Sequence, residues 1–352
     1  MKYAPIHLPA AIYHRRMAKK LRFGVLSTAN IGLKKVLPAM RRGKLTEVTA
    51  IASRELTRAR QAAQSLGIAR AYGSYEELLA DPEIDAIYNP LPNQLHLPWT
   101  AKAAEAGKHV LCEKPIGLSA GEVKELIAIR NHTGVHIAEA FMIRCHPQWV
   151  RVRELIAAGE IGPLRSVTGV FSYSNSNPAN IRNQPDCGGG GVYDIGCYLI
   201  QAARMGFGAE PRRVVSLLER DPQFDVDRLA SVLMDFEGGQ AAWSCGTQMV
   251  PHQRVFLLGT RGKIEIEIPF NAPPDRKTRI LVDRTGELTG SGVTAESFEA
   301  VDQYTLQGDS FARAVIEGTP LHVTLEDSLS NATIIDAIFR SADSGLWEIP
   351  KA

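Results

Sequence analysis

Residues 21–140 alternate between short apolar runs and amphipathic segments, and this alternation restricts the fold more than any other feature of the chain. The apolar runs suit buried parallel strands and lie at 21–27, 47–52, 84–88, 109–112 and 135–140. The segments between them carry helix signals and lie at 31–42, 56–66, 75–79, 96–106 and 119–132. Strict alternation of strands and helices predicts an α/β fold with a doubly wound parallel sheet. We place this dinucleotide-binding Rossmann domain at residues 21–145.

Beyond Ile161 the pattern changes to β-prone segments that follow one another without helices between them. The candidate strands lie at 166–173, 213–218, 229–236, 240–248, 255–258 and 263–268. The candidate helices lie at 149–158, 193–205, 310–317 and 325–341, and 271–292 is expected to be a loop with a short strand. Such a series predicts a C-terminal α+β domain with a large, open, mainly antiparallel sheet. We assign residues 146–352 to substrate binding and oligomerisation, with the last helix a candidate to pack back on the first domain.

Length, charge and cysteine content exclude several classes of protein. A chain of 352 residues has room for two domains with full cores. The net charge of +2 gives no reason to expect nucleic acid or an anionic membrane as a partner, and no apolar stretch approaches the roughly 18 residues of a spanning helix. Five cysteines without a Cys-x-x-Cys pair argue against structural zinc and against a disulfide framework. We expect reduced thiols, no metal site and a cytoplasmic protein.

Residues 1–20 are basic and carry Arg15-Arg16, the beginning of a twin-arginine export signal. Ala18-Lys19-Lys20 follows in place of the apolar region that such a signal requires, so we reject export. We interpret residues 1–20 as a flexible arm, or as the result of a start codon upstream of a natural start at Met17. An arm that reaches across a dimer is the alternative.

A cofactor-binding turn is expected directly after the first strand. Its six residues are Ser27, Thr28, Ala29, Asn30, Ile31 and Gly32. They stand where a Gly-x-Gly-x-x-Gly fingerprint belongs, with Ser27 and Ala29 as small substitutes for two of the glycines. Small residues let the backbone approach a pyrophosphate, and the following helix offers free amide donors. The alternative is an ordinary structural turn.

The end of the second strand indicates which dinucleotide binds. An NAD site often carries an acidic residue there for the ribose 2′-hydroxyl, whereas this chain has Ser53 and Arg54, with Arg58 one helical turn later. A hydroxyl and guanidinium groups suit a 2′-phosphate. We therefore expect NADP in preference to NAD, although a solvated surface role for Arg54 is the alternative.

A candidate catalytic set combines two distant segments. Lys114 follows the strand at 109–112 and precedes Pro115, so it is expected at the ligand crevice beyond the carboxyl ends of the strands. Asp194 and Tyr198 are spaced i,i+4 on a predicted helix after a run of four glycines. The Lys114 ammonium is expected to lower the pKa of Tyr198, which would make the phenol a usable acid or base. The alternatives are a surface lysine and a core tyrosine satisfied by Asp194.

These residues resemble a known family. From Leu21 to Pro350 the chain is similar to the glucose-fructose oxidoreductase / inositol dehydrogenase / rhizopine catabolism (Gfo/Idh/MocA) family. The motifs that carry the resemblance are Glu113-Lys114-Pro115 and the segments 89–96, 189–198 and 259–262. Tyrosine at position 198 resembles the branch of glucose-fructose oxidoreductase, xylose dehydrogenase and dimeric dihydrodiol dehydrogenase.

The resemblance implies roles for individual residues. Lys114 would lie near the nicotinamide ribose and the substrate hydroxyl, Tyr198 would donate or accept the proton, and Asp194 would position Tyr198 and the substrate. Arg182 would contact the sugar. The residues implied to line the cofactor crevice are Pro90, Asn93, His96 and Glu113. For His96 a capping role at the start of a helix is the alternative.

The sequence thus predicts an oxidoreductase that transfers a hydride between NADP(H) and a sugar, either an aldopyranose such as xylose or glucose or a ketosugar in reverse. The family resemblance further implies a homodimer or homotetramer formed through the C-terminal sheet. Rival hypotheses are an NADP(H)-binding redox sensor without catalysis, a dihydrodiol dehydrogenase, and an enzyme that retains its cofactor and exchanges two sugars through it.

Overall fold

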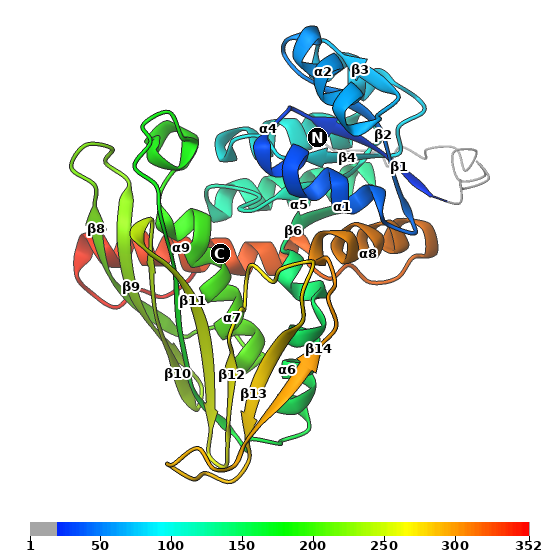
Figure 1. Cartoon of the computed structure of the whole chain (residues 1–352). Coiled ribbons are helices and arrows are strands. Elements are labelled where there is room, and N and C mark those ends of the chain that lie inside the picture. The colour runs from blue at the N-terminus through cyan, green and yellow to red at the C-terminus, as the bar shows by residue number, and fades with distance from the viewer. Residues whose placement is uncertain (1–19, 352) are drawn as a thin grey trace, which may run out of the picture.

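Two β-sheets and the helices that cover them make up the protein, as seen in a computed structural model that describes residues 20–351 (Figure 1). The six-stranded sheet occupies the upper part of Figure 1 and the eight-stranded sheet the lower part. The predicted arm at 1–20 lies outside the described residues except for Lys20. No helix within 20–351 combines the length and the apolar character needed to cross a membrane.

The first sheet is parallel throughout, as the sequence predicted, with the strand order β3-β2-β1-β4-β5-β6. Its strands are β1 (Leu21–Leu26), β2 (Thr46–Ala52), β3 (Arg70–Tyr72), β4 (Ala86–Asn89), β5 (His109–Glu113) and β6 (Ile137–Ala140). The order reverses between β1 and β4, and open α/β sheets bind ligands at such a reversal, beyond the carboxyl ends of the strands.

The helices of this domain are α1 (Leu37–Arg41), α2 (Leu56–Leu66), α3 (Tyr75–Ala80), α4 (His96–Glu105) and α5 (Ala120–Thr133). In place of one helix over 31–42, the chain forms the π-helix η2 (Gly32–Val36) followed by the short α1. Pro38 explains the irregularity, because it has no N–H to donate to the carbonyl four residues earlier.

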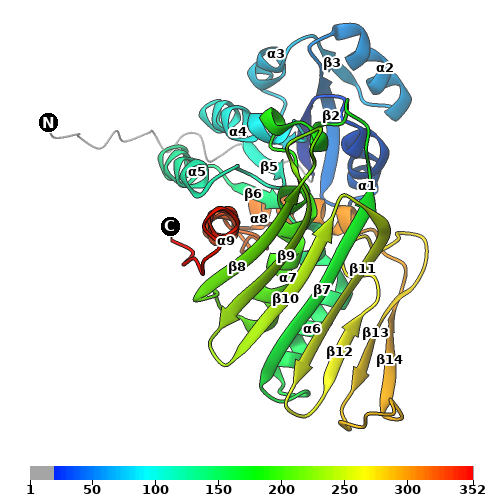
Figure 2. The same cartoon turned by 90° about the vertical axis from the view of Figure 1, so that its left-hand side faces the viewer.

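The second sheet has the order β14-β13-β12-β11-β7-β10-β9-β8 and is antiparallel except for the pair β7 and β10. Its strands are β7 (Leu164–Ser174), β8 (Arg213–Arg220), β9 (Asp227–Phe236), β10 (Gly239–Gly246), β11 (Gln248–Gly259), β12 (Lys263–Ile266), β13 (Thr278–Asp283) and β14 (Val293–Phe298). Helices α6 (Pro147–Ala157) and α7 (Cys197–Phe207) lie behind the sheet in Figure 2, and the face toward the viewer is open. The open, mainly antiparallel sheet is therefore confirmed.

Two strands of this domain differ clearly from the prediction. Strand β11 begins at Gln248 instead of Val255, and the register of its pairing with β7 shifts between Gln248 and His252. Pro251 lies in the shifted segment, where a residue without an N–H donor is tolerated. Strand β14, which is largely exposed, was not predicted.

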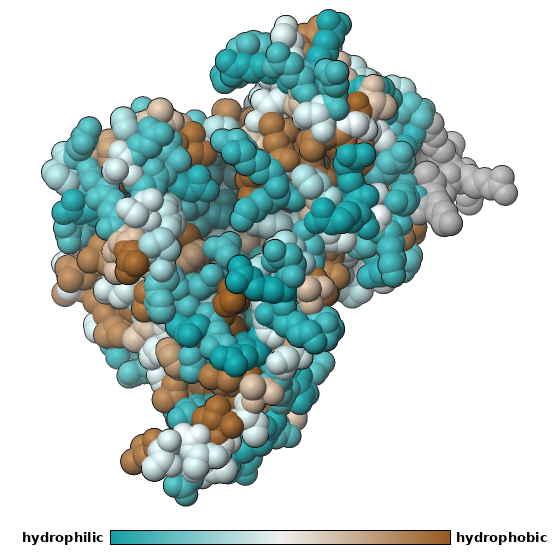
Figure 3. All heavy atoms as spheres, in the orientation of Figure 1, coloured by the Kyte–Doolittle hydropathy of each residue, from teal (hydrophilic) through white to brown (hydrophobic). Residues whose placement is uncertain are grey.

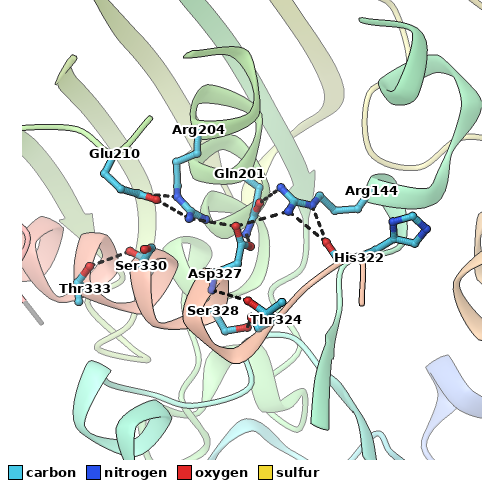
Figure 4. Close-up of polar contacts among 10 residues, drawn as sticks. All are labelled: Arg144, Gln201, Arg204, Glu210, His322, Thr324, Asp327, Ser328, Ser330 and Thr333. Atoms are coloured by element: carbon cyan, nitrogen blue, oxygen red, sulfur yellow. Dashed lines mark hydrogen bonds and ion pairs between the residues drawn. The ribbon is translucent and has the colours of Figure 1, made fainter. Parts of the chain in front are cut away.

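The last two helices return to the first domain. Helix α8 (Gln303–Glu317) packs on α1, β1 and β2, and α9 (Leu325–Ser344) contacts α5 and β6 as well as α7 and β8. Figure 1 shows α8 and α9 along the boundary between the two sheets. At the start of α9, the Asp327 carboxylate accepts hydrogen bonds from Gln201 and Arg204 of α7 (Figure 4). Helix α9 thus contacts strands of both sheets.

Candidate active site

Four polar side chains from separate parts of the sequence meet beyond the carboxyl end of β5. Lys114 follows β5 directly, and its peptide bond to Pro115 is cis. Asp194 belongs to the π-helix η7 (Val192–Gly196), Arg182 to the short helix η5 (Ile181–Asn183), and Tyr173 to the end of β7. Figure 3 shows a hollow in the surface between the first domain and the second. We call Lys114, Tyr173, Arg182 and Asp194 the site cluster.

Asp194 is the centre of the site cluster. The Lys114 Nζ donates to the Asp194 backbone oxygen at 2.6 Å and to its Oδ1 at 3.0 Å. The other carboxylate oxygen, Oδ2, accepts from the Tyr173 hydroxyl at 2.7 Å and from the Arg182 Nε at 2.8 Å. One carboxylate therefore fixes an ammonium, a phenol and a guanidinium.

The charges of the site cluster stabilise one another. Burial alone would raise the pKa of Asp194, but the cations Lys114 and Arg182 hold that pKa well below its usual range. Burial also opposes the Lys114 charge, yet the nearby Asp194 outweighs burial and raises the pKa of Lys114. Lys114 is therefore an ammonium at neutral pH. An ammonium has three N–H donors, and Asp194 takes two of them, which leaves one for another oxygen.

Gly190, two residues before η7, has a backbone conformation and a close contact that only glycine accommodates. Gly190 has φ of 111°, and a Cβ there would collide with the Asp227 carboxylate. The same carboxylate accepts a hydrogen bond from the Val192 N–H at 2.7 Å, at the first residue of η7. The glycines thus bring the backbone close to Asp227, which anchors the segment that carries Asp194.

The Tyr198 ring lies beside Lys114, but its hydroxyl bonds to neither Lys114 nor Asp194. The Tyr198 side chain is 5% exposed, packs against Phe141 and Phe171, and donates from its hydroxyl to the Met142 Sδ at 3.3 Å. The Lys114 Nζ lies 5.2 Å from the centre of the ring and is not bonded to the hydroxyl. Burial raises the pKa of Tyr198 well above its usual value. The expectation that Lys114 lowers this pKa is therefore wrong.

The phenol that reaches Asp194 is Tyr173. Asp194 lies inside η7 and Tyr198 just beyond it, and the Tyr198 hydroxyl bonds to Met142 in place of Asp194. Sequence reasoning missed Tyr173, because a tyrosine in a β-prone segment has no feature that distinguishes it from other strand residues.

The predicted cofactor turn has the conformation that the fingerprint requires. Ser27 has φ of 80°, the left-handed region that favours glycine, and its Oγ accepts from the Ala29 N–H at 3.2 Å. The helix that follows begins near Gly32, and the first N–H groups of a helix have no partner within it. Thr28, Asn30 and Ile31 are at least partly accessible. The turn therefore fits an anionic group such as a pyrophosphate.

The predicted 2′-phosphate residues lie at the neighbouring strand end. Ser53 is buried, and its Oγ accepts from the Glu55 N–H at 3.4 Å. The Arg54 and Arg58 side chains are exposed, and Arg58 forms an ion pair with Glu55 at 3.0 Å. Since β1 and β2 pair directly, these arginines flank the turn after β1, and their charge fits a phosphate.

The remaining predicted cofactor residues surround the Lys114 turn. His96 is buried with its Nδ1 2.6 Å from the Pro115 oxygen, makes no capping hydrogen bond to α4, and burial lowers its pKa to about 4. Glu113 accepts from the Tyr88 hydroxyl at 2.7 Å, and burial raises its pKa. Asn93 donates to the Gly188 oxygen at 2.9 Å, which links the two domains, and Pro90 is buried. The capping role that was the alternative for His96 is thus not observed, and the His96 imidazole lies in the interior.

Two family models match the chain. Residues 21–141 match the oxidoreductase family with an NAD-binding Rossmann fold, and residues 149–265 match the GFO/IDH/MocA C-terminal domain. An uncharacterized oxidoreductase from Rhizobium meliloti is 48% identical, over 93% of this chain and 98% of that protein. A D-xylose 1-dehydrogenase (NADP(+)) from Haloferax volcanii is 40% identical, over 92% and 98% of the two chains.

Solved structures give the same result. A 3-ketoreductase from Actinomadura kijaniata, crystallised with NADP and TDP-benzene, superposes with a TM-score of 0.85 at 32% identity. The similarity covers 92% of this chain and 98% of the ketoreductase. The chain is an oxidoreductase that belongs to the GFO/IDH/MocA family.

Proposed function

We propose that the protein is an NADP-dependent oxidoreductase that transfers a hydride between the nicotinamide and a carbon of a sugar. The substrate class is an aldopyranose such as xylose or glucose, or a ketosugar in reverse. The observation that carries the proposal is the Lys114 ammonium, which Asp194 fixes with one N–H left over, beyond the carboxyl end of β5. Similarity to a xylose dehydrogenase and to a sugar-nucleotide ketoreductase supports the substrate class.

The residues proposed to hold NADP lie on the same side of the sheet. Ser27 to Gly32 would receive the pyrophosphate, and Ser53, Arg54 and Arg58 the 2′-phosphate. When bound, the nicotinamide supplies the hydride acceptor or donor. Arg54→Asp should reverse the preference for NADP over NAD, because a carboxylate repels a phosphate but accepts from a ribose hydroxyl.

The site cluster is proposed to handle the substrate oxygen. Lys114 would donate its third N–H to that oxygen and stabilise the negative charge that develops when the carbon gains or loses a hydride. Tyr173 and Arg182 would keep Asp194 in place, and Arg182 would also contact the sugar. In the direction of ketone reduction, the proton on the new hydroxyl would come from Lys114, which regains one from water.

The sequence assigns proton transfer to Tyr198, with Lys114 tuning its pKa. The Tyr198 hydroxyl donates to the Met142 sulfur in the core, whereas Lys114 has a donor to spare. The geometry therefore favours Lys114 for the proton and a packing role for Tyr198. Tyr198→Phe decides between them, because a large loss of turnover is expected only if Tyr198 transfers the proton.

We also propose that two copies associate through the open face of the eight-stranded sheet. Leu217, Leu233 and Phe256 line a groove there and are 76%, 47% and 37% exposed. Contiguous apolar side chains on a surface favour association. Leu233→Arg should convert the oligomer to monomer in size-exclusion chromatography with light scattering, and a wild-type monomer would contradict the proposal. The five free thiols favour a cytoplasmic location.

The proposed function is tested by absorbance at 340 nm with NADP and NAD, against aldoses, ketosugars and a trans-dihydrodiol. Turnover of a sugar with NADP preferred is the expected result. A wild-type protein that binds NADPH but turns over no substrate would support the redox-sensor hypothesis instead. Turnover of the dihydrodiol alone would keep the oxidoreductase and replace the substrate class.

A further inference from the structure

The turn that carries Lys114 is held from two sides by buried ionisable side chains. Glu139 of β6 accepts from the Ile116 N–H at 2.9 Å through its Oε1. The His96 Nδ1 lies 2.6 Å from the Pro115 oxygen. The two side chains are only 4% and 1% exposed. Neither is accessible enough to be a sugar-binding group, so a role in the reaction has to act through the backbone of this turn.

His96 also links this turn to the neighbouring strand end. Its Nε2 lies 2.7 Å from the oxygen of Leu91, which follows β4. In the neutral ring, one tautomer donates to Pro115 and the other to Leu91. The imidazole therefore lies between the segment after β5 and the segment after β4, and the tautomer with its proton on Nδ1 is the one that holds the Lys114 turn.

Glu139 reaches the turn because of the sheet register. It pairs with Cys112 across β5 and β6, two residues before Lys114. A buried carboxyl group costs free energy unless it is hydrogen-bonded, and here the Ile116 N–H supplies a hydrogen bond. The carboxyl group thus fixes the chain directly after the cis peptide bond.

These contacts matter because lysine is a flexible side chain. Asp194 holds the Lys114 Nζ, but the four-carbon stem can keep that contact in several backbone positions. Only a fixed backbone leaves the third N–H pointing in one direction. A misplacement of about 1 Å in an active site can lower the rate about 100-fold.

We propose that His96 and Glu139 are positioning residues that fix the Lys114–Ile116 turn and thereby aim the Lys114 ammonium at the substrate oxygen. The inference rests on the proposed function for its effect on turnover. It extends that function by two residues that contact neither the substrate nor the carboxylate of the site cluster.

The Glu139 contact is tested with a matched pair of variants. Glu139→Gln keeps an oxygen that can accept from the Ile116 N–H, whereas Glu139→Met keeps the size and loses the acceptor. We expect a kcat about 10- to 100-fold lower for Glu139→Met, with the KM for sugar and the Kd for NADPH within about twofold of wild type. Glu139→Gln should stay within about threefold in kcat. Equal kcat values for the two variants would overturn the role of Glu139.

The His96 contacts are tested with a second pair. The amide nitrogen of asparagine can replace Nδ1, and that of glutamine can replace Nε2. His96→Asn should therefore keep the Pro115 contact and most of kcat, whereas His96→Gln should lose about 10-fold or more in kcat. The reverse order, or equal losses with weakened NADPH binding, would contradict the proposal.

Hydrogen exchange of the Ile116 amide separates failure of this inference from failure of the proposed function. The amide should exchange slowly in wild type and in Glu139→Gln, and at least about 10-fold faster in Glu139→Met. Should the wild-type protein turn over no sugar, the proposed function has failed, while the exchange rates still decide whether Glu139 fixes the turn. Fast exchange in the wild type would refute the contact itself.

Discussion

Two clusters of charged side chains lie where the domains meet, and we expect the same chemistry to serve different purposes in them. In the site cluster, Asp194 lies between Lys114 and Arg182. In the second, which we call the junction cluster, Asp327 of α9 lies between Arg204 and Arg144, at 3.1 and 3.5 Å (Figure 4). Each carboxylate is thus shared by two cations.

The donors of the junction cluster bond to carboxylates, although the Arg204 Nη1 has no hydrogen-bond partner among the described residues. Arg204 of the junction cluster donates twice to Glu210, at 2.8 and 2.7 Å, and once to Asp327. Asp327 also lies in the first turn of α9, where the Thr324 Oγ accepts from its N–H at 3.3 Å and the helix dipole favours a negative charge. The junction cluster therefore connects α7 to α9, as Figure 4 shows.

In the site cluster, one N–H group of Lys114 is left for a ligand. Lys114 gives two of its three N–H groups to Asp194, and the residue lies at the strand ends where ligands bind. Because a buried ion pair is by itself weak support for stability, the presence of charge does not distinguish the clusters. The position of the site cluster at the strand ends does. We therefore expect substitutions in the site cluster to affect turnover and those in the junction cluster to affect stability.

The largest effect is expected for Lys114→Met. Loss of the donor to the substrate oxygen should lower kcat about 100- to 1000-fold, as for removal of a donor from an oxyanion hole. Asp194 keeps Arg182 and Tyr173 as partners, so the free energy of unfolding should change by less than about 2 kcal/mol. Steady-state kinetics and urea denaturation measure the two quantities. A fully active variant would show that the site cluster is not catalytic.

The opposite pattern is expected for Asp327→Ala. Arg144 and Arg204 lose a shared partner in the interior, and breaking a buried pair typically costs about 3 kcal/mol. The retained bonds from Arg204 to Glu210 should keep the cost near that value or below it. The folded variant should retain kcat within about threefold. A large loss of kcat without loss of stability would mean that the two clusters are coupled.

The sequence predicted the fold better than it predicted which charged residues form the site cluster and which form the junction cluster. Buried strands such as β1 and β5 show continuous apolar runs, whereas the missed strands β3 and β14 are the outermost strands of their sheets. An edge strand is short or exposed and need not show an apolar pattern. The local pattern is therefore strongest where both faces of a strand are buried.

The sequence also predicted only part of the candidate site, because local patterns do not reveal contacts between distant segments. The turns after strands are local, so Lys114 and Ser27 could be recognised from their neighbours. The contact of Lys114 with Asp194 joins residues 80 positions apart, and the Tyr198 hydroxyl bonds to Met142 in place of either residue. No local pattern marks Tyr173 or Glu139, whose roles depend on which strands are neighbours. The long-range contacts required the structure.

The two tyrosines near the site cluster provide a smaller test. Tyr173→Phe removes one of two donors to the Asp194 Oδ2, so kcat should fall about 10-fold, the equivalent of one hydrogen bond. Tyr198→Phe removes only a hydroxyl bonded to sulfur in the core and should change kcat by less than about threefold. Circular dichroism serves as the control for folding. A reversed order of effects would restore Tyr198 as the group that transfers the proton.

The last prediction concerns Glu139, which is influenced by residues of the junction cluster and bonds to the turn after Lys114. Burial raises its pKa to about 7, while Asp327 of the junction cluster raises it and Arg204 lowers it. Between about pH 4.5 and 7, Glu139 therefore keeps its proton in the folded protein but has lost it in the unfolded chain. The contribution of Glu139 to the free energy of unfolding is thus fully present below about pH 4.5 and declines as the pH rises toward 7. Glu139→Gln cannot release this proton. The difference in free energy of unfolding between Glu139→Gln and wild type should therefore shift by about 1 to 2 kcal/mol in favour of the variant from pH 4.5 to pH 8. Urea denaturation at the two pH values measures this difference. A constant difference across that range would mean that Glu139 is ionised in the folded protein, and that its bond to Ile116 is charge-assisted.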